Sequence, residues 1–179
     1  MMRQVRRVVY RIFGWMPWFV QRLVLVAVQP SYLVGASAIV VASNGDILLA
    51  RHSYKRGWAA PGGFLNRREG AGDAVAREVW EECGLRVEVE GEPVTLVRID
   101  ERIVELVYRV RPADESTARS ARPVSVEIVE LAWFSQDELP TDLTPITRIA
   151  IDALAEAEAA RIAERGVEPA RRVKPVATR

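Results

Sequence analysis

The chain has 179 residues, of which 49% are hydrophobic and 27% are charged, and its formal net charge is +1. This length and composition suit one globular domain with a substantial core. The chain has a single cysteine, which excludes an internal disulfide, so a reducing, cytoplasmic setting is expected. Because it also has only one histidine, no Cys/His zinc cluster can form.

Charge is unevenly distributed along the chain. Five arginines and no acidic residue occur before Asp46, and the other 20 of the 25 basic residues and all 24 acidic residues follow. The N-terminal segment is therefore electrostatically distinct from the rest of the protein.

Residues 1–30 are predicted to form a basic helical extension. Apolar residues recur at helical spacing from Met2 to Met16, and Arg3, Arg7 and Arg11 share the opposite face. Breaks in the helix are expected where a glycine and a proline interrupt this pattern, at Gly14 and Pro17.

A nearly continuous apolar stretch then runs from Pro17 to Val28. Residues 1–28 suit a peripheral membrane contact, in which arginines meet anionic lipid and aromatic side chains anchor in the interface. Packing on the core and a homodimer contact are the alternatives. The anchoring side chains would be Trp15, Trp18 and Phe19.

A membrane-spanning helix and a cleaved signal peptide both fit poorly. The uncharged run from Leu23 to Ser43 is long enough to span a bilayer, but residues 29–31 (Gln-Pro-Ser) interrupt it and its second half is needed as a strand. Cleavage near residues 36–38 (Ala-Ser-Ala) would cut into that strand.

From residue 31 to residue 165 the chain is predicted to be one α/β domain, because apolar alternation and turn signals follow one another closely. His52, after the second strand, is expected on a pocket rim or at the surface. The final helix should bury alanines together with Ile149, Leu154 and Ile162. The expected elements are strands at 33–42, 47–51, 94–99, 103–110 and 128–134, a polar mobile loop at 112–123, and a helix at 146–164 that begins at Thr144-Pro145.

The most informative segment places four glutamates beside a glycine loop and around one helix. At about 100° per residue, Glu78, Glu81 and Glu82 fall within an arc of roughly 100°. Arg77 stands four residues before Glu81 and can pair with it. The opposite side of the helix is apolar and is expected to bury against a sheet; it comprises Val75, Ala76, Val79, Trp80 and Cys83.

Glycines flank this helix on both sides. Gly62 and Gly63 follow Pro61 and allow a tight turn that can aim a carbonyl at a metal or approach a phosphate. Gly84 stands where a C-terminal cap favours a left-handed residue. Oxygen ligands alone favour Mg²⁺ or Mn²⁺ over zinc or copper.

Residues 63–85 match the pattern G-x5-E-x7-R-E-U-x-E-E-x-G-U, where U is apolar, and so resemble the Nudix box of the Nudix hydrolases. The resemblance, which covers about residues 33 to 140, implies an α/β/α sandwich with a mixed central sheet. It also implies a metal-dependent pyrophosphohydrolase that cleaves a diphosphate linkage in a nucleoside diphosphate joined to another group.

The resemblance further implies roles for the matching positions. Glu78, Glu81 and Glu82 would be catalytic metal ligands, helped by the carbonyl of Gly62 or Gly63. Glu69 would be an outer or occasional metal ligand, and Arg77 would orient the carboxylates. The alternatives are a catalytically silent sensor of a nucleotide ligand and a membrane-surface or dimeric partner protein.

The resemblance leaves the general base open between the box and a later loop, and the substrate contacts are expected in loops outside the box. Glu127 is the preferred candidate for a base outside the box, and a surface role at the start of a strand is its alternative. Four residues are candidates for substrate binding. Tyr54 or Trp58 could stack on a nucleobase, and Arg56 and Arg67 could contact phosphates. The alternative for Trp58 is a place in the core, and the alternative for the two arginines is a solvated position on the surface. The competing bases are Glu101, Glu115 and Glu130, and Lys55 and Arg68 are further cationic candidates.

The tail at residues 166–179 is predicted to be disordered. It is basic but has no aromatic residue, so specific nucleic-acid binding is not expected.

Overall fold

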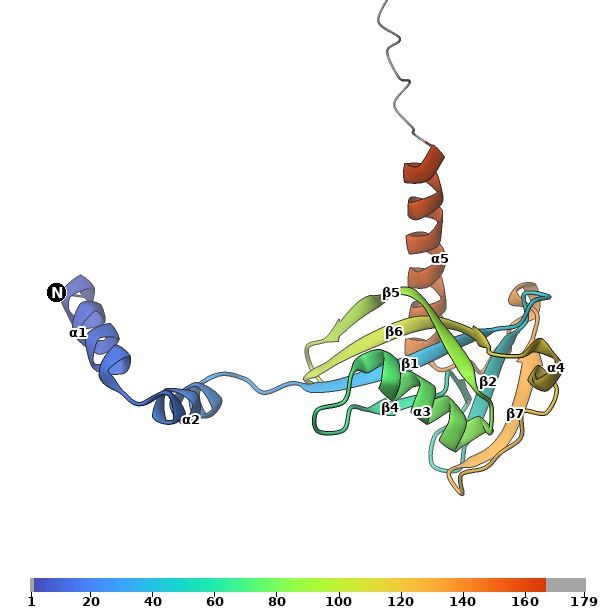
Figure 1. Ribbon diagram of the computed structural model, residues 1–179, viewed down its shortest axis with the longest axis horizontal. Helices are drawn as coiled ribbons and strands as arrows, with labels where there is room; N and C mark the ends of the chain where they lie inside the picture. The colour runs from blue at the N-terminus through green and yellow to red at the C-terminus, as the bar shows by residue number, and fades with distance from the viewer. Residues whose placement is uncertain (1, 167–179) are drawn as a thin grey trace, which may run out of the picture.

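A computed structural model describes residues 2–166, so the predicted disordered tail lies outside the described residues from position 167 onward. One mixed sheet with helices on both faces forms the body of the molecule, and two helices precede it (Figure 1). In chain order the elements are α1 (Met2–Trp15), α2 (Trp18–Val28), β1 (Leu33–Val41), β2 (Ile47–His52), β3 (Trp58–Ala59), β4 (Gly62–Phe64), α3 (Ala71–Cys83), β5 (Val87–Arg98), β6 (Ile103–Pro112), α4 (Glu115–Ala118), β7 (Ile128–Phe134), the 3₁₀ turn η1 (Gln136–Glu138) and α5 (Pro145–Gly166).

The sheet is organised around β1. Its main path runs β3-β2-β1-β6-β5, while β4 pairs with β1 and β7 pairs with β2. β1 runs parallel to β6 and antiparallel to β2 and β4, and the other strand pairs are antiparallel. β4 pairs with the first half of β1 and β2 with its last residues, so the two short partners share one edge of the same strand.

Alternating side chains of β1 serve the two faces of the sheet, as the period of two requires. Ala36, Ala38 and Val40 pack in a cluster with the apolar side of α3. Ile39 and Val41 pack in a second cluster that includes Ala150 of α5. The predicted α/β/α sandwich with a mixed sheet is therefore confirmed.

Two predicted segments, the strand β5 and the loop after β6, differ in the structure. β5 begins at Val87, seven residues earlier than expected, and absorbs its extra residues in an irregularity between Glu90 and Val94. The segment predicted as a polar loop holds the short helix α4, where the carboxylate of Asp114 accepts from the backbone N–H of Ser116 at 2.9 Å.

The buried side of α5 was predicted in part. Ala150 is buried and Leu154 packs on the second cluster, as expected, whereas Ile149 and Ile162 are 52% and 66% exposed. The side of the helix that faces the sheet carries Thr147, Ala150 and Leu154, so Ile149 and Ile162 fall outside the contact.

On α3, Trp80 is 48% exposed instead of buried, and the guanidinium of Arg86 lies 4.9 Å from its ring centre. Only the narrower stripe that includes Val75 and Val79 faces the sheet, and Trp80 stands at its margin.

The predicted helical extension is present as α1 and α2, and the interruption falls at Pro17, whereas α1 continues through Gly14. Neither helix packs on the sheet, and α2 has no buried residue (Figure 1). Among residues 2–166 no helix combines the length and the apolarity needed to cross a bilayer.

Candidate active site

The glycine turn brings the backbone of β4 against the helix that carries the glutamates. A Cβ on Gly62 would lie 2.5 Å from the carbonyl oxygen of Ala36, and one on Gly63 would lie 2.3 Å from Oε1 of Glu78. Backbone atoms leave no room for a side chain at position 62, so Gly62 is required there, whereas a side chain at position 63 would displace the carboxylate of Glu78. The backbone N–H of Gly62 donates to Oε2 of Glu82 at 3.2 Å.

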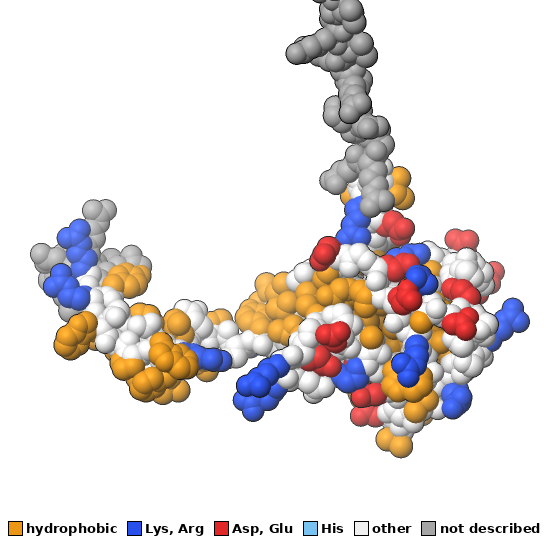
Figure 2. All heavy atoms as spheres, in the orientation of Figure 1, with side chains coloured by type: hydrophobic (Ala, Val, Ile, Leu, Met, Phe, Trp, Pro, Cys, Tyr) orange, Lys and Arg blue, Asp and Glu red, His pale blue; other side chains and the backbone are white. Residues whose placement is uncertain are grey.

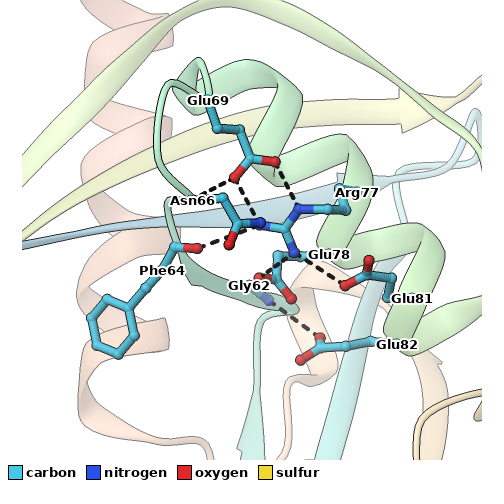
Figure 3. A network of polar contacts seen from close by, with 8 residues as sticks. All are labelled: Gly62, Phe64, Asn66, Glu69, Arg77, Glu78, Glu81 and Glu82. Carbon is cyan, nitrogen blue, oxygen red and sulfur yellow. Dashed lines mark hydrogen bonds and ion pairs between the residues drawn. The ribbon is translucent and has the colours of Figure 1, made fainter.

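Arg77 holds three of the four glutamates together (Figure 3). Its guanidinium donates to both carboxylate oxygens of Glu69, from Nε at 2.7 Å and from Nη2 at 3.0 Å. Nη1 donates to Glu78 at 2.8 Å and to Glu81 at 3.1 Å. The pairing with Glu81 that the helical spacing predicted is present, but the shortest bond goes to Glu69.

Glu69 is the most firmly held member of this network. The backbone N–H of Asn66 donates to its Oε2 at 2.7 Å in addition to the two bonds from Arg77. These hydrogen bonds, with that from Arg77 first, lower the pKa of Glu69 to about 2. Its charge is already neutralised by Arg77, which suits the outer role expected for it.

Glu82 is the carboxylate that Arg77 does not reach. It is only 7% exposed, although it belongs to the acidic side of the helix. Burial, reinforced by the negative charge of Glu78, raises the pKa of Glu82 to about 7. A buried carboxylate held only by a backbone N–H favours a bound cation or a proton.

A cavity of about 790 Å³ opens beside these groups. Glu78, Glu82, Gly62 and Gly63 line it on one side, together with the start of α5. Its volume lies within the range of small-molecule and cofactor sites, roughly 300–1,000 Å³.

The loop after β2 contributes cations and a ring to the same cavity. Tyr54, Lys55 and Arg56 all line it, as predicted for two of the substrate-binding candidates. Partial burial and the charge of Glu127 raise the pKa of Tyr54, and Glu82 and Glu78 add to this effect. The three carboxylates therefore act on one tyrosine.

Of the four candidate bases, Glu127 lines the cavity. Its carbonyl accepts from the backbone N–H of Ser53 at 2.8 Å, which ties the start of β7 to the loop carrying Tyr54. Glu130 pairs instead with Arg51 at 3.4 Å, Glu101 pairs with Arg98, and Glu115 begins α4.

Several predicted residues lie outside the cavity lining. Glu81 is exposed and paired with Arg77, and Arg67 is exposed in the loop after β4. Trp58 is only 5% exposed and packs edge-on against Phe134 with ring centres 4.9 Å apart. This corrects the stacking role proposed for Trp58 and agrees with its alternative place in the core.

His52 is also corrected. It is buried at 3% exposure and does not line the cavity, against the expected position on a pocket rim or at the surface, and its ring centre lies 5.5 Å from that of Tyr54. Neither ring nitrogen has a hydrogen-bond partner among the described residues, and burial lowers its pKa. Cys83 is fully buried and its pKa is raised by burial, in line with a structural thiol.

Sequence reasoning missed polar residues at the floor of the cavity. Ser37 on β1 is 6% exposed, and its hydroxyl has no partner among the described residues. Glu105 on β6 lies 3.6 Å from Arg98, and both line the cavity. A signal was available for Ser37, which interrupts an otherwise apolar strand, whereas Glu105 is one of several polar residues of β6.

The donor chemistry fits a hard divalent cation. Glu78 and Glu82 supply carboxylate oxygens, and the buried Glu82 lacks a neutralising side chain. Within residues 2–166 no three His, Cys, Asp or Glu side chains already stand in a coordinating arrangement, because Arg77 engages Glu78 and Glu81. Binding of the cation would require the carboxylates of Glu78 and Glu81 to turn away from Arg77 and towards the cavity.

Glu82 should make the stability of the metal-free protein depend on pH. Its folded pKa of about 7 exceeds the ordinary value of 4.5, so the native state holds the proton more tightly than the unfolded chain does. That stabilisation is complete below pH 4.5 and is lost as the pH rises through about 7. Relative to Glu82→Gln, the wild type should lose about 3 kcal/mol of unfolding free energy across this window.

Denaturant unfolding in EDTA at pH 5 and pH 8, on both proteins, measures this difference. Parallel pH dependence in the wild type and in Glu82→Gln would contradict it.

The family model for the NUDIX domain matches residues 31–154. A MutT-like protein from Streptomyces ambofaciens is 32% identical over 126 residues, which cover 70% of this chain and 79% of that protein. The human 8-oxo-dGDP phosphatase NUDT18 is 30% identical over 112 residues, which cover 59% of this chain and only 33% of that larger protein.

The crystal structure of a MutT NUDIX hydrolase from Burkholderia pseudomallei has a TM-score of 0.61 and 31% identity, covering 70% of this chain and 99% of that one. The chain therefore belongs to the NUDIX domain family and is a hydrolase that acts on pyrophosphate bonds.

Proposed function

We propose that this hydrolase requires Mg²⁺ or Mn²⁺ and cleaves the diphosphate linkage of a nucleoside diphosphate joined to another group. The observation that carries the proposal is the cavity where Glu78, the buried Glu82 and Glu127 face the same space as Lys55 and Arg56. Such a site offers carboxylates for a cation and cations for a phosphate. A relative, human NUDT18, is an 8-oxo-dGDP phosphatase, and its substrate is a nucleoside diphosphate.

In this proposal Glu78 and Glu82 hold the metal ion with a carbonyl of Gly62 or Gly63, Glu81 turns in as a further ligand, and Glu69 stays an outer ligand. When bound, the ion would supply positive charge that neutralises the charge developing as the linkage breaks. Arg77 keeps Glu78 and Glu81 oriented at the rim of the site.

Glu127 receives the proton of the attacking water in this scheme. Oxygen from water forms a bond to one phosphorus atom, and the bond from that phosphorus to the bridging oxygen breaks. The bridging oxygen leaves with the second phosphate. Lys55 and Arg56 contact the substrate phosphates, and the ring of Tyr54 stacks on the nucleobase of the substrate.

We also propose the bounds of the hydrolase domain and its cellular compartment. The hydrolase domain would span residues 31–165. A reducing, cytoplasmic setting accords with the single cysteine, Cys83, which is buried.

Turnover of a substrate panel tests the reaction class. ADP-ribose, a nucleotide sugar, a dinucleoside polyphosphate, dGDP and 8-oxo-dGDP should be incubated with Mg²⁺ or with EDTA, and the products separated by ion-exchange chromatography. We expect turnover of one class well above the rest, lost in EDTA and reduced at least about 100-fold in Glu82→Gln. Full activity of that variant would refute the metal assignment, and silence across the panel with Mg²⁺ bound would indicate a sensor.

Glu127→Gln tests the general base, and Glu130→Gln in β7 is its matched variant. Loss of the proton acceptor should lower kcat about 100-fold or more. Glu130→Gln, whose carboxylate pairs with Arg51 outside the cavity lining, should keep wild-type kcat. Equal, wild-type rates in both variants would place the base elsewhere.

Arg56→Ala tests the phosphate contact, and Arg67→Ala is its control. Because Arg56 lines the cavity and Arg67 does not, only the first change should raise KM, by roughly tenfold, with kcat little changed. Steady-state kinetics on the best substrate of the panel measure both. An equal rise of KM in the two variants would point to a general electrostatic effect in place of a contact.

A further inference from the structure

The N-terminal arm, defined as residues 2–28, exposes large apolar side chains on both of its helices. Trp15 is 94% exposed and Trp18 is 73% exposed. Contiguous exposed apolar surface marks an interaction surface. Figure 1 shows the arm standing away from the sheet. The other exposed apolar side chains of the arm are Tyr10, Ile12, Phe19, Leu23, Val24, Leu25, Val26 and Val28.

α2 is apolar on all sides, and its one charged residue is Arg22. A helix of this kind is stable when it is buried in protein or in lipid. Its 11 residues extend about 17 Å, roughly half the hydrocarbon thickness of a bilayer. It is therefore too short to span and suits a position within one leaflet interface.

α1 complements it with an amphipathic pattern. Arg7 and Arg11 are exposed and lie one helical turn apart, on the side opposite Ile12 and Phe13. Trp15 and Trp18 flank the junction between the two helices. Aromatic rings at a polar boundary and arginines above it form the pattern of an interfacial membrane helix.

Charge decides between lipid and a second copy of the chain. The first 45 residues contain five arginines and no carboxylate. In a symmetric dimer built on the arm, each arm would meet the arginines of the other without an acidic partner from that segment. Anionic lipid headgroups supply the missing negative charge.

We propose that the N-terminal arm docks this protein on an anionic lipid bilayer, with α2 and the apolar side of α1 in the interface.

The domain presents a second apolar surface on the side of the arm. Figure 2 shows hydrophobic side chains along the arm and again at the adjoining end of the domain. The pairings of Gly35 with Phe64 and of Leu33 with Ile103 bring these residues to one end of the sheet. Phe64 and Ile103 also line the cavity, so docking would place its mouth towards the lipid surface. The exposed members of this end are Leu33, Val34, Phe64, Val97 and Ile99.

Cosedimentation of the full chain with vesicles tests the proposal. One set contains phosphatidylcholine alone and the other equal parts of phosphatidylcholine and phosphatidylglycerol. We expect binding to the anionic set, weakened by salt, and little binding to the neutral set.

Two arm variants separate the contributions to binding. Arg7→Gln/Arg11→Gln should weaken binding to the anionic vesicles about tenfold or more, and Trp18→Ser/Phe19→Ser should weaken it as strongly. Arg119→Gln/Arg122→Gln removes the same charge from two exposed positions that follow α4 and should bind like the wild type. Unchanged melting temperatures would show that every variant is folded.

Two results would overturn the proposal. One is absence of binding to anionic vesicles, or binding that neither arm variant weakens. The other combines two findings: light scattering shows that the wild type is a dimer which Trp18→Ser/Phe19→Ser dissociates, and the wild type does not bind vesicles. Neither readout depends on hydrolysis, so a failure here is distinct from a failure of the proposed reaction.

Discussion

The site depends on the contacts of one guanidinium. Arg77 neutralises Glu69, Glu78 and Glu81, which would otherwise repel one another across a single turn of α3 and the loop before it. The same bonds fix the backbone, because Glu69 belongs to the loop and Arg77 also donates to the carbonyl of Phe64 at 3.4 Å. A lysine could supply the charge but not the fork that reaches several carboxylates in a fixed geometry.

Glu82, the one glutamate of the four that Arg77 does not contact, is as important to the site as the three that it holds. Glu82 faces the cavity with a buried carboxylate and a single N–H donor, so the fold carries an electrostatic cost that a cation or a proton relieves. The glycine turn makes this arrangement possible, since any side chain on Gly63 would displace Glu78. Functional sites commonly depart from the rules that stabilise the rest of a fold, and here the departure is confined to one side chain.

Local patterns predicted the parts of this structure that depend on local geometry. Helical spacing gave the pairing of Arg77 with Glu81, and the left-handed Gly84 ends α3 as expected. Burial of Glu82 was not predictable, because it results from β4 lying against the helix. Sequence reasoning favoured Glu127 among the candidate bases, but its place on the cavity lining results from the contact between the start of β7 and the loop after β2.

Aromatic residues misled sequence reasoning in both directions. Trp58 and Trp80 are equally apolar, yet Trp58 packs on Phe134 in the core while Trp80 stands at the margin of the α3 contact beside Arg86. Only tertiary packing distinguishes them, and the same holds for the buried His52. Predictions therefore failed where a side chain's surroundings come from a distant part of the chain.

The arm and the cavity are built from separate parts of the protein. Every residue that lines the cavity lies between Gly35 and Ala150, so no atom of the arm is needed to assemble the site. A surface anchor can nevertheless change what the site encounters, because confinement near a membrane raises the local concentration of substrates held there. The apolar end of the sheet, with Phe64 shared between that surface and the cavity, provides the physical connection between the two.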